Sequence, residues 1–460
     1  MVPLRKEMKR LRQEILAQFS PELLEQIAKQ TRFIQRKRKV TAMDTLFLFV
    51  FMGKHLSNAT LDDLCGIFHQ ITGTTISSEG LNQRFNEQAV LFLSKVFESI
   101  LQTTLGNSFT GVTKYASLFK RILVLDSTAF QLPATLSDQF PGTGCTSVKF
   151  QIEFDLLSGR FTHAHFEAGS TSDVLTGNQL SKGIQENDLI LRDLGYLNLE
   201  ELKNLDEQGA RYFVSRLKRN AIVYRKNPNP TYHKNGNVQM KTAYIRYEIG
   251  ELAQTIKEGE MKEFEDIYVG KGKMKVRLMI YHFPKEEKEK RLQKVTNGVR
   301  GKRHDCSERT KQMTAYGFYI TNLPQEVTAT EIHQLYSLRW QIELLFKSWK
   351  STLDLTQCKP IKIERLHCYF YSQLIQMMLC TMMTYQMRYL LWKKSQKELS
   401  EMKSFKLVYD RLRKIYSAIM EGAEFVVQEL LLLYEQLEVN GLKSRKRGKP
   451  TFQQLIGTLN

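Results

Sequence analysis

Apolar runs of different kinds divide the chain into helix-like and strand-like parts. The stretch up to about Ser117 contains the mostly apolar run Met43 to Met52 among segments with helical spacing, which predicts a buried helix. From Arg121 the pattern changes, because Ile122 to Leu125 is wholly apolar and is followed at once by Asp126. A short apolar run of this kind is typical of a strand that is buried on both faces. We therefore predict a helical region followed by a sheet.

Two helices separated by a turn are predicted inside the N-terminal region. Thr60 is a suitable N-cap for the first helix, Thr72 to Thr75 forms the turn, and the second helix opens at Ser77 or Ser78. The polar side of the second helix would carry Asn82, Gln83, Arg84 and Asn86. This pattern fits a helix-turn-helix that binds DNA and fits an ordinary helical hairpin equally well. The preceding basic run Arg36 to Lys39 favours DNA.

Strand-like segments follow Asp126 in a recognisable order. In chain order, strands are predicted at Val148 to Leu156, Arg160 to Glu167 and Asp188 to Asp193, followed by a helix around Leu199 to Glu207 and a strand at Arg211 to Leu217. Ser158-Gly159 joins the strands Val148 to Leu156 and Arg160 to Glu167 as a hairpin. A helical stretch precedes the strand that ends at Asp193. When Ile122 to Leu125 is counted as the first strand, the order is βββαβαβ, with aspartates at the ends of the first and fourth strands. This order is similar to that of the ribonuclease H-like fold.

Paired carboxylates at strand ends are suited to one kind of chemistry. Phosphodiester cleavage by two metal ions needs carboxylate oxygens that hold a pair of Mg²⁺ about 3.5–4 Å apart. A single Asp at a strand end is usually a loop cap, so two aspartates alone do not decide the matter. A third carboxylate on a nearby helix would complete the set.

The segment Leu335 to Lys350 offers that carboxylate. At the helical repeat one face carries Tyr336, Arg339, Glu343, Lys347 and Lys350. The adjoining sector carries Leu335, Leu338, Ile342, Leu345, Phe346 and Trp349. A glutamate flanked by cations is commonly a solvated ion-pair face. The apolar stripe, however, would seat this face beside the sheet, so we expect one continuous helix with a reactive edge.

Charge indicates the class of partner. The 67 Lys and Arg residues exceed the 48 Asp and Glu residues, which gives a formal net charge of +19 and favours a polyanion such as nucleic acid. The basic run Lys443 to Lys449 fits a solvated tail and a DNA clamp equally well.

Cysteine use and the apolar segments indicate a compartment. The six cysteines have no zinc-ligand spacing and are expected to be free thiols. The charged segment Met1 to Arg12 lacks the apolar core of a secretory signal, so a cytoplasmic location is expected. Cys368 to Trp392 is apolar but is interrupted by polar residues, which favours a buried helix over a membrane span.

A different composition marks residues 220–313 as a β-rich insertion. Glu265 to Val269 and Met274 to Phe283 predict strands around a Gly-Lys turn, Pro284 to Lys294 predicts a charged helix, and Arg300 to Arg303 predicts a basic loop. Helices follow from about Ile361, including a largely apolar helix at 425–437. This last region could cover the core, dimerise or hold DNA.

The spacing Tyr336-x2-Arg339-x3-Glu343-x6-Lys350 resembles the Tyr-Arg-Glu-Lys signature of bacterial insertion-sequence transposases of the insertion-sequence-four family, in the DDE superfamily. The run that begins at Asp193, Asp-x-Gly-Tyr, is similar to the second motif of that family. Together with Asp126 after an apolar strand, the resemblance spans the whole catalytic core.

This resemblance implies roles for individual residues. Asp126, Asp193 and Glu343 would be the catalytic and metal-binding triad for Mg²⁺, for which Mn²⁺ can substitute, and Tyr336, Arg339 and Lys350 would contact phosphates of the DNA end. The helix face adds Lys347, and the helix-turn-helix adds Arg84 and Asn82, as predicted DNA contacts. In some relatives a nearby aromatic residue stacks on a flipped base. Tyr316, Phe318 and Tyr319 are the candidates here, but Gly317 takes the simplest aligned position, so core strand aromatics are favoured.

The sequence therefore predicts an α/β protein with a ribonuclease H-like core that is interrupted by a β-rich insertion and flanked by helical regions. The predicted parts are residues 1–117, 118–219, 220–313, 314–360 and 361–460. The predicted function is that of a transposase that acts on double-stranded DNA as a homodimer. No membrane is expected among its partners. The alternatives are a nuclease on the same core that does not join DNA, and a non-catalytic DNA-binding protein derived from a transposase.

Overall fold

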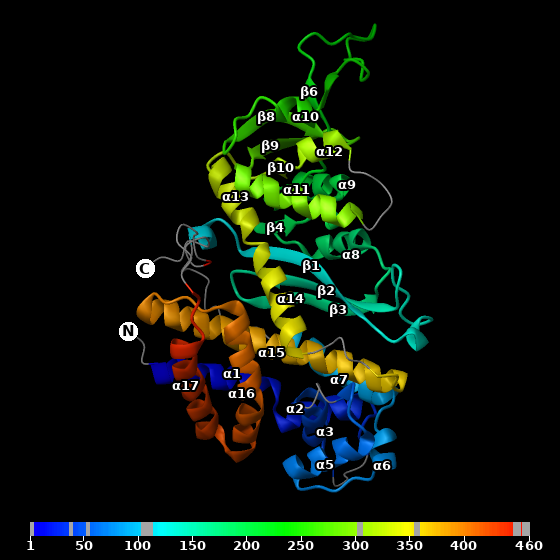
Figure 1. Ribbon diagram of the computed structural model, residues 1–460, viewed down its shortest axis with the longest axis vertical. Helices are drawn as coiled ribbons and strands as arrows, with labels where there is room; N and C mark the ends of the chain where they lie inside the picture. The colour runs from blue at the N-terminus through cyan, green and yellow to red at the C-terminus, as the bar shows by residue number, and fades with distance from the viewer. Residues whose placement is uncertain are drawn as a thin grey trace. The chain divides into compact units, whose positions relative to one another are not determined.

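The computed structural model describes residues 4–35, 40–51, 56–102, 114–300, 307–353, 359–444 and 452. Contacts divide the chain into two compact units. Unit 1 comprises Met1–Lys114, Asp126–Thr171 and Trp340–Asn460, and unit 2 comprises Tyr115–Leu125 and Ser172–Arg339. The predicted basic run Arg36 to Lys39, residues 301–303 and 445–449, Cys306 and Cys358 lie outside the described residues. Figure 1 labels the elements of both units.

Helices make up most of unit 1. They are α1 (Leu4–Gln18), α2 (Pro21–Gln30), α3 (Ala42–Phe51), α5 (Leu61–Thr72), α6 (Ser78–Asn82), α7 (Glu87–Gln102), α14 (Trp340–Leu353), α15 (Ile363–Ser395), α16 (Glu401–Glu421) and α17 (Ala423–Asn440). Helix α15 packs on α3, α7 and α16 and is buried along most of its length, as predicted for Cys368 to Trp392. No described helix has the length and hydropathy that a membrane crossing needs.

The free thiols expected from the sequence are confirmed where the structure describes them. Cys65, Cys145, Cys368 and Cys380 are all unpaired.

The helix-turn-helix expectation is confirmed in its first half and corrected in its second. Thr60 caps α5 through a capping box, and Gly73 ends that helix in the left-handed conformation. Helix α6 stops at Asn82, so Arg84 lies beyond it. The side-chain oxygen of Asn86 accepts the Ala89 amide at 2.9 Å and thereby caps α7. The second helix is shorter than predicted because this cap begins a new helix at once.

The sheet segment of unit 1 is the predicted hairpin. Strands β2 (Ser147–Asp155) and β3 (Arg160–Ala168) pair antiparallel, next to the second half of β1 (Arg121–Gln131). Gly159 turns the hairpin with φ +72°, and a Cβ there would meet the Tyr385 ring at 2.4 Å. Only glycine therefore fits both the backbone and the space at this turn.

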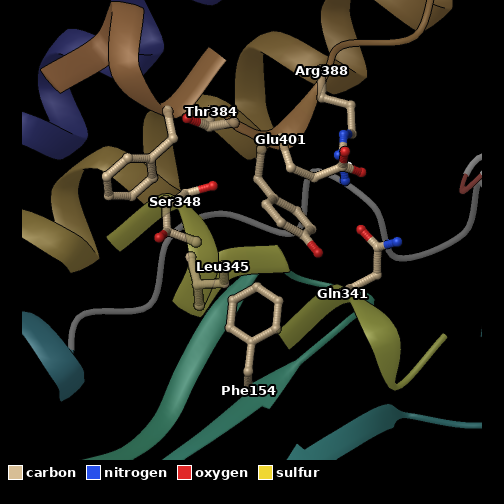
Figure 2. A pocket seen from close by; sticks show the side chains of 10 residues that line it. Phe154, Gln341, Leu345, Ser348, Thr384, Arg388 and Glu401 are labelled. Atoms are coloured by element: carbon tan, nitrogen blue, oxygen red, sulfur yellow. Dashed lines mark hydrogen bonds and ion pairs between the residues drawn. The ribbon is translucent and has the colours of Figure 1, made fainter. Parts of the chain in front are cut away.

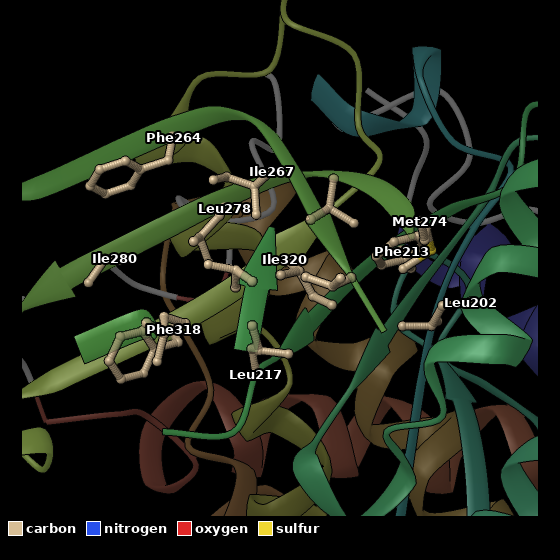
Figure 3. Close-up of a cluster of buried hydrophobic side chains, with 14 of the residues drawn as sticks. Leu202, Phe213, Leu217, Phe264, Ile267, Met274, Leu278, Ile280, Phe318 and Ile320 are labelled. Carbon is tan, nitrogen blue, oxygen red and sulfur yellow. The ribbon is translucent and has the colours of Figure 1, made fainter. Parts of the chain in front are cut away.

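Unit 2 contains a mixed sheet with the strand order β1-β4-β5-β10-β9-β8-β6-β7. The strands are β4 (Asp188–Arg192), β5 (Tyr212–Arg216), β6 (Ile222–Lys226), β7 (Tyr244–Glu248), β8 (Met261–Val269), β9 (Met274–His282) and β10 (Tyr316–Thr321). The first half of β1 pairs parallel with β4, and β4 pairs parallel with β5, whereas all later pairs are antiparallel. Side chains from the parallel strands and from the antiparallel strands form one apolar core, which includes Phe213, Leu278 and Ile320 (Figure 3).

The helices of unit 2 are α8 (Asp173–Leu180), α9 (Leu199–Glu207), α10 (Ile249–Ala253), α11 (Lys285–Arg300), α12 (Glu308–Met313) and α13 (Ala329–Ser337). The predicted order βββαβαβ is therefore confirmed as β1, β2, β3, α8, β4, α9 and β5. The predicted strands and charged helix of the insertion are also present, with α11 longer than expected. Phe318 and Tyr319 are buried in β10, which confirms them as core aromatics.

The prediction of one continuous helix over Leu335 to Lys350 is wrong. Helix α13 ends at Ser337 and α14 begins at Trp340. Between them the Leu338 amide donates a hydrogen bond to the Leu335 carbonyl at 3.0 Å. This three-residue spacing belongs to a 3₁₀ turn, which interrupts the α-helix. Leu335 and Leu338 are both fully buried, so the apolar stripe continues across the break and hides it in the sequence.

Candidate active site

Asp193 follows β4 and has a defined set of neighbours within unit 2. Its Oδ1 accepts a hydrogen bond from the Tyr336 hydroxyl at 3.2 Å. The Nη1 of Arg216 lies 3.9 Å from the same oxygen. Oδ2 has no hydrogen bond to a residue that the structure describes, and the side chain is 36% exposed. One carboxylate oxygen is therefore oriented by the protein and the other is available to a ligand.

Tyr336 is held in place by packing. It is 8% exposed, and its ring lies 5.0 Å from the Tyr319 ring in an edge-to-face arrangement. Burial, followed by the negative charge of Asp193, raises the pKa of Tyr336 above its usual range. The phenol therefore stays protonated at physiological pH and remains a hydrogen-bond donor.

Asp126 lies in β1, directly after the apolar run that predicted the strand. The Ser127 amide donates to its Oδ1 at 2.8 Å, and the side chain is partly exposed. Val124 is registered opposite Leu191, and Asp126 follows Val124 by two residues just as Asp193 follows Leu191 by two. The sequence thus places the two aspartates at equal steps along neighbouring strands.

Glu343 lies in the first turn of α14, which packs on the sheet segment of unit 1. The Trp349 ring, fully buried, lies 5.8 Å from Phe150 of β2. The Nζ of Lys350 lies 5.2 Å from the ring of Phe130 in β1. Strand alternation puts Phe130 on the same face as Asp126, and helical spacing puts Lys350 on the same face as Glu343. Helix α14 therefore lies over the strand face that carries Asp126.

The remaining cations predicted on this helix face stay accessible. Lys347 and Lys350 are exposed and Arg339 is half-buried. Lys347 contacts the exposed Trp340 ring at 4.3 Å, and Arg339 lies 5.9 Å from the Tyr336 ring. Lys347 and Lys350 can therefore reach a phosphate backbone.

The candidate triad is divided between the units. Asp126 and Glu343 belong to unit 1, and Asp193 belongs to unit 2. Among the residues that the structure describes, no three Asp, Glu, His or Cys side chains are gathered so as to hold a metal ion. The assignment of these three carboxylates to a metal site stays a prediction.

Arg216 is a neighbour of Asp193 that the sequence interpretation did not single out. It ends β5, which pairs with β4 through the register Arg192 to Ser215. One further step along both strands brings Arg216 beside Asp193. The sequence feature that could have identified Arg216 is its position at the end of the strand that follows Asp193.

One of the two predicted N-terminal contacts, Arg84, lines a polar groove in unit 1. The groove has a volume of about 790 Å³, and Arg84 is part of its lining, whereas Asn82 is not. Among the residues that the structure describes, its polar lining consists of Arg32, Gln35, Gln83, Arg84, Asn86 and Gln88, with no acidic side chain. This composition suits a negatively charged ligand.

Comparison with known proteins identifies the family. Residues 117–379 match the family model described as "Transposase DDE domain". The chain is 36% identical over 97% of its length to the transposase for insertion sequence element IS231F of Bacillus thuringiensis subsp. israelensis, covering 94% of that relative. It is 33% identical over 98% of its length to the transposase for IS1151 of Clostridium perfringens, covering 96% of that relative.

A solved chain of the piggyBac transposase synaptic complex with hairpin DNA aligns with 95% of this chain and 88% of its own length, at a TM-score of 0.45 and 11% identity. The family assignment rests on the sequence matches, which run through almost the whole chain and confirm the resemblance seen in its motifs. The chain belongs to the DDE transposases, in the insertion-sequence-four family.

Proposed function

We propose that this transposase binds the inverted repeats at the two ends of its insertion sequence, cuts the DNA there and joins the ends to a new site. The observation that carries the proposal is the hydrogen bond from Tyr336 to Asp193. It joins the Tyr-Arg-Glu-Lys signature to the Asp-x-Gly-Tyr motif across 143 residues of chain. Two motifs that resemble one family's signature thus meet at a single carboxylate.

We also propose that β1 to β5 with α8 and α9 form a ribonuclease H-like core. Support comes from the βββαβαβ order, from parallel pairing of β1, β4 and β5, and from the antiparallel hairpin β2–β3. In this division residues 118–219 and 314–360 make the core, and residues 1–117, 220–313 and 361–460 are added to it.

Asp126, Asp193 and Glu343 are proposed to hold the metal ions. DDE transposases use divalent metal ions, and three carboxylates supply the hard oxygen donors that Mg²⁺ and Mn²⁺ prefer. Bound ions would stabilise the attacking and leaving oxygens of the phosphodiester. Cutting consumes one water and leaves a 3′-hydroxyl and a 5′-phosphate. In joining, the 3′-hydroxyl displaces a target 3′-oxygen, which leaves as a hydroxyl.

The cations near these carboxylates are proposed to grip DNA. Lys347 and Lys350 have the exposure that phosphate contacts require, and Arg339 beside them is half-buried. Tyr336 is better suited to another role, because its ring is buried and its hydroxyl already donates to Asp193. We therefore assign Tyr336 to position Asp193 and leave the DNA contacts to the cations.

Recognition of the element's ends is proposed for the N-terminal helices. Arg84 in the polar groove and Asn82 on α6 are the predicted contacts, and double-stranded DNA is the partner. We propose that the complex holding both ends contains two copies of the chain and acts in the cytoplasm.

The proposal is tested with purified protein and a DNA fragment that carries the element's two ends. In Mg²⁺ or Mn²⁺ we expect 3′-hydroxyl ends and products in which these ends are joined to target DNA. Cleavage without joined products would favour the nuclease alternative. Binding without cleavage would favour the non-catalytic alternative.

Replacement of Tyr336 by Phe should slow cleavage by about tenfold, because loss of one hydrogen bond to a charged group is worth roughly 1.5 kcal/mol. The ring that packs on Tyr319 remains, so the fold should be unchanged. We expect a lower kcat and a higher Mn²⁺ requirement, with the same KM for end DNA. An equal loss in Tyr316→Phe, whose hydroxyl lies outside this contact, would contradict the role.

A further inference from the structure

Residues 227–243, between β6 and β7 of unit 2, form a hairpin extension that we call the arm. Asn227 and Ala243 close its base through a backbone hydrogen bond of 2.9 Å, and the Gln239 amide bonds the Thr231 carbonyl at 2.8 Å. Tyr232 and Val238 form an isolated antiparallel bridge farther out. The arm extends beyond β6 (Figure 1, the green segment past the β6 label). It is thus a formed two-stranded ribbon rather than an irregular loop.

The surface of the arm is apolar and basic at once. Tyr232 is 59% exposed and Met240 is 74% exposed. Lys234 and Lys241 are exposed, and neither has an ion-pair partner among the described side chains. No Asp or Glu occurs in the sequence between Lys226 and Glu248. A surface that exposes apolar side chains together with lysines that have no acidic neighbour is suited to bind a polyanion that also exposes apolar groups.

The base of the arm is fixed to the sheet by cation–π contacts. The Nζ of Lys273, in the β8–β9 turn, lies 3.1 Å from the Tyr224 ring centre. Lys226 lies 5.9 Å from the Tyr268 ring, and Arg225 lies 5.9 Å from the Tyr247 ring. These contacts join β6 to β7 and β8, so the base of the arm is held in line with the strands of the sheet.

Strand directions relate the arm to Asp193 within unit 2. From β4 the sheet runs through one parallel step to β5 and then four antiparallel steps to β6. Strand β6 therefore points the same way as β4, and the arm leaves the sheet at the ends where Asp193 also lies. Five strand spacings separate β4 from β6 by about 24 Å, and two strands of roughly eight residues extend the arm by about 26 Å.

We propose that the arm binds the duplex of the element's own end, roughly 7 to 10 base pairs from the phosphodiester that is cut. The arm's length runs perpendicular to the strand spacing, so its tip lies about 35 Å and its root about 24 Å from Asp193, and the range follows at about 3.4 Å per base pair. A two-stranded ribbon fits a DNA groove, where Lys234 and Lys241 reach phosphates and Tyr232 and Met240 contact the groove. The inference rests on the proposed function, because it places the cut phosphodiester at Asp193.

The end duplex is favoured over target DNA by this distance. A contact so near the Asp193 position falls on the same duplex as the phosphodiester being hydrolysed. Before cutting, that duplex is the element's end.

The test compares two double variants of the full chain that lose the same charge. Lys234→Ala with Lys241→Ala alters the arm, and Lys285→Ala with Lys290→Ala alters exposed lysines on α11 of the same unit. The probe is a duplex copied from one end of the element, with about 20 base pairs inside the cut. For the arm variant we expect a 10- to 100-fold lower affinity and a salt slope smaller by about 2, since each phosphate contact contributes about 0.9. The α11 variant should bind as wild type does.

A shortened duplex localises the effect. With about six base pairs inside the cut, wild type and the arm variant should bind equally, because the arm's contact is missing from both complexes. Tyr232→Ser with Met240→Ser should weaken binding to the long duplex without changing the salt slope, because no charge is removed. Equal melting temperatures of all variants would show that they fold.

Two results would overturn the inference. One is an arm variant that binds and cuts the long duplex as wild type does. The other is an arm variant that cuts normally but fails only in joining, which would assign the arm to target DNA. Failure of the proposed function appears separately, as wild-type protein that binds the ends and forms no joined product.

Discussion

Replacement of Asp126 or Asp193 by Asn, or of Glu343 by Gln, is expected to lower the rate of end cleavage about 1000-fold or more. Each change removes one anionic oxygen donor from the proposed metal site, and a loss of about 4 kcal/mol in transition-state stabilisation corresponds to that factor. End-DNA affinity should change by less than about threefold, because the phosphate contacts come from other side chains. Single-turnover cleavage and equilibrium binding on the same duplex measure the two effects.

The control for these variants must be a carboxylate outside the site. Asp188 is unsuitable, although strand alternation points it away from Asp193, because it is fully buried and bonded to Arg121 and to the Gln185 amide at 2.7 Å. Its loss would disturb the fold. Glu186 is exposed and two residues away, so Glu186→Gln should cleave at the wild-type rate. Full activity in any triad variant would remove that residue from the site.

The strands of the core could be predicted because their sequence signals are local. Ile122 to Leu125 and Leu189 to Leu191 are fully or almost fully buried apolar runs, each followed within two residues by an aspartate. Such runs need no knowledge of distant contacts, because burial on both faces demands apolar residues at every position. The hairpin at Gly159 is equally local, since the turn and both strands are contiguous.

The chain's departures from regular helix could not be predicted in the same way. Neither Gly nor Pro marks the break at Leu338, and the apolar stripe continues through it. Asn86 was interpreted as part of a polar helix face, whereas it begins a new helix as a cap. In both places the sequence pattern is compatible with one helix, and packing decides where the backbone leaves it.

The contacts of Asp193 depend on residues far away in the sequence. Tyr336 was identified from motif spacing, but its buried donation to Asp193 follows from the packing of α13 and β10 through Tyr319. Arg216 has no motif, and only the register of β4 and β5 brings it near. Which residues belong to a site was therefore easier to predict than what each one touches.

Removal of the Glu401 carboxylate is expected to destabilise unit 1 by about 3–5 kcal/mol. Arg388 of α15 is 1% exposed, and its Nη2 donates to Glu401 Oε1 of α16 at 2.6 Å. Figure 2 shows the two side chains together at the small cavity that Thr384 and Ser348 also line. Burial alone would lower the pKa of Arg388, but the charges of Glu401, Tyr385 and Glu398, together with the hydrogen bond to Glu401, outweigh it and raise that pKa. The cation therefore stays charged and needs its partner.

A double variant separates the loss of the pair from the loss of packing. Glu401→Ala leaves a buried, unpaired guanidinium, whereas Arg388→Met with Glu401→Leu replaces both charges by apolar groups and should recover most of the stability. All three tryptophans lie in unit 1, so their fluorescence follows the melting of that unit. We expect Glu401→Ala to lower its melting temperature by roughly 6–10 °C and the double variant to melt within about 3 °C of wild type. If Glu401→Ala melts at the wild-type temperature, Arg388 does not depend on this ion pair.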